Sequence, residues 1–142
     1  MSESPSTDRL LPHSAPQDTG ARLFLLGVRR IGVGGLNDAQ AASIMIGAFG
    51  LSFRRPLLLM RALTAELARA SQETIMIAPS CCARMTTAES MLLGAVARAN
   101  EKPRIAHEIF CRLCGIDNAI GVLSSAQALA QAFADLGRPI EV

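Results

Sequence analysis

The sequence predicts a mainly α fold, a compact single domain of five to six helices that could include one small two-stranded β element. Half of the 142 residues are apolar, which is enough for one modest core. The apolar share comes mainly from alanine, leucine, isoleucine and methionine, and aromatic residues make up only 4%. Because alanine and leucine favour helix while sheets favour aromatic side chains, this composition indicates a helical protein.

The beginning of the chain differs from the rest in composition. Residues 1–20 are rich in serine and proline and poor in large apolar side chains. Such a segment cannot bury enough surface to offset the entropy lost on ordering, so it is predicted to be a disordered tail, with His13 in solvent. Residues 21–142 are predicted to form the single helical domain.

The first predicted helix spans residues 21–31. Its apolar side chains form a broad face at helical spacing, and Arg22, Arg29 and Arg30 are expected to stay outside that face. A run of glycines follows and is expected to end the helix, because glycine is costly within a helix and favourable after one.

Capping residues and helix breakers divide the rest of the chain. Asn37 is the predicted N-cap of the second helix, and Thr86 with Glu89 forms a capping box before the fourth. The five later helices are predicted over residues 38–49, 56–71, 87–100, 103–115 and 125–136. Two short apolar segments, Thr74–Ala78 and Ala119–Leu123, are the candidate strands.

The second and third helices with their short turn could suggest a helix-turn-helix DNA reader. A recognition helix presents polar side chains from its first turns. Here Leu57, Met60, Leu63 and Leu67 repeat at helical spacing from the first turn onward, which is typical of a core face. The net charge is only +2. Neither observation favours a nucleic-acid partner.

The candidate site lies on the fifth helix. His107, Cys111 and Cys114 fall at i, i+4 and i+7 and therefore form one stripe. With Cys81 or Cys82 as a further donor, they could hold zinc or iron. If the two short strands pair antiparallel, Cys81 and Cys82 approach Cys114. If the strands pair parallel, about 16 Å separates Cys81 and Cys82 from Cys114.

The cysteines also allow other interpretations. They could be ordinary buried thiols, since free cysteine is among the most buried residue types. They could be redox-active, because Arg84 and Arg112 each lie beside a cysteine. His107 and Cys111 could form a catalytic pair, although the sequence has no nucleophile elbow, no His-Glu-x-x-His and no clustered carboxylates.

No secretory signal and no uncharged apolar segment long enough for a bilayer is recognised, so no membrane partner is expected. A cytoplasmic location is predicted, where cysteines are usually reduced. The leading hypothesis is a non-catalytic interaction or regulatory module that binds an unknown protein partner or forms a homo-oligomer. The alternative is a metal-binding or thiol-redox module.

Four stretches carry a resemblance: Ser52–Leu57, Cys81–Thr86, Cys111–Leu113 and Ser124–Gly137. Taken together, they make the chain similar to a family of small uncharacterised bacterial proteins, over about residues 21–139. This resemblance implies a single domain with a variable tail, and it implies no activity, cofactor or site residue.

Overall fold

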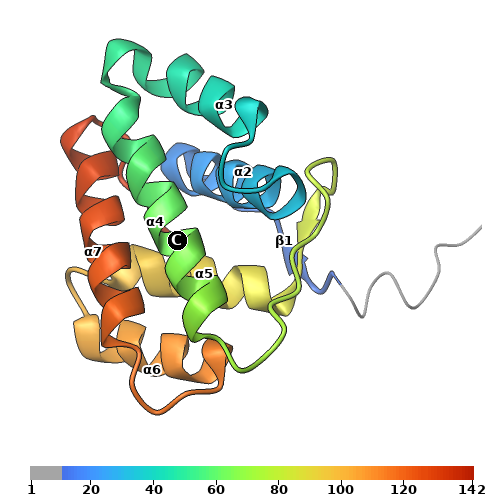
Figure 1. The fold of residues 1–142 in the computed structure, drawn as a ribbon, viewed down its shortest axis with the longest axis vertical. Helices are drawn as coiled ribbons and strands as arrows, with labels where there is room; N and C mark the ends of the chain where they lie inside the picture. Colours follow the sequence, from blue (N-terminus) through green and yellow to red (C-terminus); the bar gives the residue numbers. More distant parts are fainter. Residues whose placement is uncertain (1–10) are drawn as a thin grey trace, which may run out of the picture.

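The computed structural model describes residues 11–142 as six α-helices and one small sheet (Figure 1). The mainly α prediction is confirmed. The helices are α2 (Thr19–Gly34), α3 (Ala39–Phe49), α4 (Arg54–Ala70), α5 (Thr87–Arg98), α6 (Pro103–Cys114) and α7 (Ile120–Asp135). A 3-10 turn, η1 (Gly50–Ser52), joins α3 to α4, and the two strands are β1 (His13–Ser14) and β2 (Arg84–Met85).

Polar caps determine where several helices begin. The Asp38 carboxylate accepts a hydrogen bond from the Ala41 N–H at 2.9 Å, so Asp38 is the N-cap of α3 in place of the predicted Asn37. The capping box of Thr86 and Glu89 before α5 is confirmed. Gly115 ends α6 in the left-handed conformation, with φ of 67°, which an L side chain rarely adopts.

The helices pack in pairs around one hydrophobic core. In Figure 1, α4 and α7 run side by side, with α3 at one end of the molecule and α6 at the other. Large side chains from all six helices are fully buried between them: Phe24, Met45, Leu63, Leu92, Phe110 and Phe133. The predicted core face of α4 is confirmed, because Leu57, Met60, Leu63 and Leu67 are all buried.

Both predicted strands are wrong. The segment Ala119–Leu123 begins α7 instead, and residues 74–78 form neither strand nor helix. Short apolar runs do not distinguish strand from helix by periodicity alone. In residues 74–78, side chains form the backbone hydrogen bonds that a neighbouring strand would otherwise form. The Met76 carbonyl accepts from the Thr86 hydroxyl at 2.7 Å, and the Ala78 N–H donates to Glu89 at 3.0 Å.

The observed sheet instead involves the segment before α2. His13 pairs with Met85, and Ser14 pairs with Arg84, in an antiparallel register. The Arg84 guanidinium also donates to the Leu11 and Pro12 carbonyls at 2.9 and 2.8 Å. Residues 11–20 of the predicted tail therefore contact the folded part, and His13 is half-buried rather than solvated. Residues 1–10 of that predicted tail lie outside the described residues.

The first helix is longer than predicted at both ends. It begins at Thr19, where Asp18 accepts from the Ala21 N–H at 2.9 Å. It continues through Gly32 and Gly34, so the first glycines of the run do not end it. Its last turn is held because the Gly35 N–H donates to the Ile31 carbonyl at 2.8 Å.

Candidate functional site

The five predicted site residues lie in two parts of the chain, a loop and helix α6. Cys81 is exposed and Cys82 half-buried in the loop before β2, while His107 and Cys111 are half-buried on α6 and Cys114 is buried. Across residues 11–142, no three histidine, cysteine or acidic side chains gather in a way that could hold a metal ion. The strand pairing that would bring the two cysteine groups together does not form. Within the stripe on α6, His107 and Cys111 make a direct side-chain contact.

His107 has a structural task at the start of α7. Its Nε2 accepts a hydrogen bond from the Ala119 N–H at 3.0 Å, which makes the imidazole neutral with its proton on Nδ1. Ala119 is the N-cap of α7, so the histidine satisfies one of the backbone donors that a helix start leaves unpaired. His107 lies on α6, as the sequence predicts, and its hydrogen bond with the Ala119 N–H gives it a structural role as a cap for α7.

The Cys111 thiol lies against the same ring. Its Sγ is 3.6 Å from His107 Nε2 and 3.5 Å from the Asp117 carbonyl. A general base must offer a free lone pair to the thiol proton. The Nε2 lone pair is already engaged by the backbone of Ala119, so the pair is not arranged for nucleophilic catalysis.

Cys114 is the least reactive of the predicted donors. Burial raises the pKa of its thiol above the usual value, only partly offset by a hydrogen bond with Ser71. The thiol is also at the C-terminal end of α6, where the helix dipole disfavours a thiolate. Cys114 is therefore a core side chain in this fold.

A buried ion pair lies beneath the loop that carries Cys81 and Cys82. Arg29 is 2% exposed and Glu89 1% exposed. The two side chains meet in a bidentate contact, with Arg29 Nε 2.8 Å from Glu89 Oε2 and Arg29 Nη2 3.0 Å from Glu89 Oε1. The same guanidinium donates to the Cys82 and Arg84 carbonyls at 2.8 and 2.7 Å. Arg29 thus connects α2, α5 and the loop.

Both oxygens of the Glu89 carboxylate are also hydrogen-bonded. Besides Arg29, it accepts from the Ala78 N–H at 3.0 Å and from the Thr86 N–H at 2.9 Å. The prediction that Arg29 stays outside the core face of its helix is wrong. The missed signal is its spacing: Arg29 continues the i, i+4 row of Ala21 and Leu25, both of which are buried.

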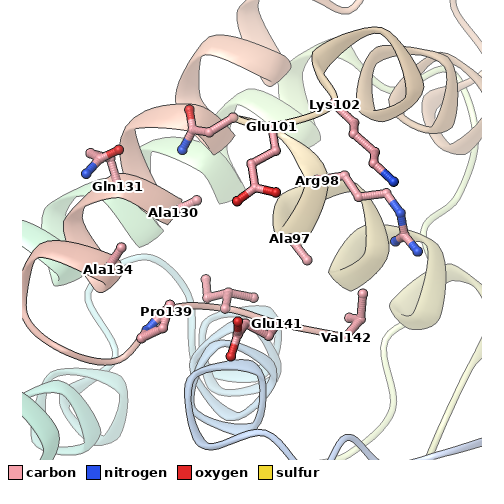
Figure 2. A pocket seen from close by; sticks show the side chains of 12 residues that line it. Ala97, Arg98, Glu101, Lys102, Ala130, Gln131, Ala134, Pro139, Glu141 and Val142 are labelled. Atoms are coloured by element: carbon pink, nitrogen blue, oxygen red, sulfur yellow. The ribbon is translucent and has the colours of Figure 1, made fainter.

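A hollow of about 390 Å³ lies on another side of the molecule, between the α5–α6 turn, α7 and residues 139–142. Figure 2 shows the Glu101 side chain pointing into this hollow, with Gln131 on one side and Arg98 on the other. Its lining contains neither histidine nor cysteine. The hollow therefore offers a polar surface with carboxylate and amine groups but no imidazole or thiol.

Comparison with protein families adds one finding. The model of the family of unknown function DUF6628 matches residues 2–136. The chain belongs to this family. DUF6628 membership agrees with the resemblance to uncharacterised proteins, and it transfers no activity. No curated protein and no solved structure matches the chain. Among residues 11–142 of this DUF6628 member, no helix has both the length and the hydropathy needed to cross a bilayer.

The buried carboxylate makes the stability of this DUF6628 member sensitive to acid. Burial alone would raise the pKa of Glu89, but hydrogen bonds from Arg29 and from the Thr86 and Ala78 N–H groups outweigh it and hold the pKa below its usual value. A lowered folded pKa gives stability that is present above the unfolded value, about 4.3. That stability is lost as pH falls through the folded pKa.

We therefore expect the free energy of unfolding to fall steeply below about pH 4.3, as measured by urea denaturation at a series of pH values. Glu89→Gln should flatten this acid slope. Asp135→Asn is the control, because the Asp135 pKa is lowered by Gln131 and Arg55 at the surface, where solvent weakens the effect. An acid slope in Glu89→Gln as steep as in the wild type would contradict the assignment.

Proposed function

We propose that the protein is a non-catalytic interaction module that associates with a second copy of itself through α3. The observation that carries this proposal is the poor burial of an uncharged helix. The 11 residues of α3 include no charged side chain, yet only Ala41 and Met45 are buried. A helix of this composition is normally buried on most sides, so its exposed face is suited to a partner surface.

The exposed side of α3 suits close approach of another helix. Ala39, Ser43 and Gly47 are exposed at i, i+4 and i+8, which makes a row of small side chains. A Cβ added at Gly47 would meet nothing within 4 Å, so packing within the chain does not require glycine there. Glycine within a helix costs about 0.5–1 kcal/mol relative to alanine. A neighbouring helix seated on this row would offset that cost.

Apolar side chains accompany the row of small residues. Ile46 on α3 is 48% exposed, and Leu51 in η1 is 100% exposed. Leu36, just before α3, is exposed as well. A two-fold contact places the same surface on both partners, so like charges would oppose one another. An uncharged α3 avoids this repulsion, which supports a second copy as the partner.

We expect the wild-type chain to dimerise and Ile46→Glu to be monomeric, because the substitution brings two carboxylates into an apolar contact. Sedimentation velocity over a range of concentrations measures this. Ile105→Glu is the matched control, since Ile105 lies on α6 with 46% exposure. A wild-type chain that stays monomeric at high concentration, or equal effects of both substitutions, would overturn the proposal.

Fewer observations support the alternative function, a metal-binding or thiol-redox module. Among residues 11–142, no three of the donors His107, Cys111, Cys114, Cys81 and Cys82 gather where one metal ion could bind them, and His107 Nε2 is engaged by backbone. The interaction module is therefore the better-supported proposal.

We also propose a cytoplasmic location in a bacterial cell. All four cysteines are free thiols in the structure, and Cys81 is exposed. Exposed unpaired thiols are typical of reducing compartments. Cell fractionation with detection of the chain tests the location, and recovery from a secreted fraction would contradict it.

A further inference from the structure

An apolar cleft of about 270 Å³ lies between α2, α4, α5 and the segment that follows α4. Its walls are formed by the apolar side chains of Val28, Leu67, Ile75, Ile77 and Leu92. An apolar cavity of about 150 Å³ is known to hold benzene. This cleft therefore has room for a molecule somewhat larger than one aromatic ring, such as a chain of about six carbons.

The polar side chains of the cleft differ in whether they have hydrogen-bond partners within the protein. The Thr64 hydroxyl donates to the Met60 carbonyl at 2.7 Å. The Ser71 hydroxyl donates to the Glu73 carbonyl at 2.6 Å and accepts from the Glu73 N–H at 3.2 Å. The Glu73 carboxylate has no hydrogen-bond or ion-pair partner within residues 11–142. Glu73 is exposed and is the one acidic residue of the lining.

Two helix C-termini lie beside Glu73. The Gln72 N–H donates to the Cys114 carbonyl at 2.7 Å, so the C-terminal ends of α4 and α6 meet beside it. Glu73 also packs against Gly115, because a Cβ added there would lie 3.0 Å from Glu73 Oε1. Helix C-termini carry partial negative charge and favour cations. Within the last turns of these helices, Arg69 is paired with Glu66 and Arg112 is exposed, and among residues 11–142 neither arginine forms an ion pair with Glu73.

We propose that this cleft binds a small organic amine. The ammonium group pairs with the Glu73 carboxylate at the mouth, and the apolar part lies between Leu67 and Ile77. Charge complementarity selects the cation, because an anion would face a carboxylate and two helix C-termini. The apolar walls select a short hydrocarbon group over a hydrated metal ion. This site is independent of the α3 surface and stands whether or not the chain dimerises.

The test uses the full chain and three probes of equal length: hexylamine, hexanol and hexanoate. Titration followed by two-dimensional NMR measures each affinity and locates the site. We expect hexylamine to bind at least tenfold more tightly than hexanol, and hexanoate to bind weakest. Shifts should concentrate at residues 64–77. Equal affinity for hexylamine and hexanol, or shifts confined to the hollow of Figure 2, would overturn the proposal.

Two substitutions separate the charge from the apolar walls. Glu73→Gln should weaken hexylamine binding at least tenfold and leave hexanol binding unchanged, whereas the control Glu101→Gln, in the hollow of Figure 2, should change neither. Ala68→Leu should weaken both probes, because Ala68 lines the cleft from an exposed helical position that tolerates a larger side chain. Unchanged hexylamine binding in Glu73→Gln would contradict the assigned role of the carboxylate.

Discussion

Arg29→Met is expected to lower the free energy of unfolding by about 3–5 kcal/mol, because it leaves the Glu89 carboxylate buried without its partner. Methionine preserves much of the arginine volume, so the loss reports the charge and the hydrogen bonds more than a cavity. It also leaves the Cys82 and Arg84 carbonyls without their donor. Unmet buried acceptors add to the cost. Urea denaturation at pH 7 gives the difference.

The neighbouring arginine supplies the control for this experiment. Arg30 pairs with Asp38 at 3.1 Å, but its side chain is 21% exposed. Arg30→Met should therefore cost no more than about 1 kcal/mol. In the double variant Arg29→Met with Glu89→Leu, the total loss should be smaller than the sum of the single losses, since no unpaired charge remains. Equal losses in Arg29→Met and Arg30→Met would show that the buried pair does not stabilise the fold.

Leu63→Asp is expected to unfold the domain. Leu63 is 1% exposed at the centre of the buried row on α4 and belongs to the hydrophobic core. A charge buried without a partner costs several kcal/mol, and the apolar contacts of leucine are lost as well. Domains are stable by only about 5–15 kcal/mol, so this change removes most of the margin.

Circular dichroism and proton NMR check this result through the loss of helical signal and of dispersed methyl resonances. Ala62→Asp is the matched control, because Ala62 precedes Leu63 directly on α4 and is exposed. It should remain folded with a nearly unchanged melting temperature. A folded Leu63→Asp variant would show that the core face of α4 is assigned incorrectly.

Local signals account for the parts of the fold that the sequence predicts well. The capping box at Thr86 and Glu89, the glycine after α6 and the leucine row of α4 each act within a few residues. These local signals predict where the helices lie. The predicted N-cap of α3, Asn37, is one residue from the observed N-cap, Asp38, because aspartate and asparagine cap helices almost equally well.

Long-range contacts account for the errors. Residues 74–78 have the composition of a strand, but their backbone is hydrogen-bonded by the side chains of Thr86 and Glu89, which come ten and eleven residues after their partners Met76 and Ala78. The burial of Arg29 depends on a carboxylate 60 residues later in the chain. The spacing on one helix predicts that His107 lies beside Cys111. It cannot show that the His107 imidazole already accepts a hydrogen bond from the Ala119 N–H.

The contacts that hold the Cys81–Cys82 loop are made largely to main-chain atoms. The loop contributes the Met76, Cys82 and Arg84 carbonyls and the Ala78 N–H, and the side chains that bind them belong to Arg29, Thr86 and Glu89. Every non-proline residue carries the same backbone donor and acceptor. The path of this loop is thus fixed largely by side chains that lie outside it, on α2 and at the start of α5.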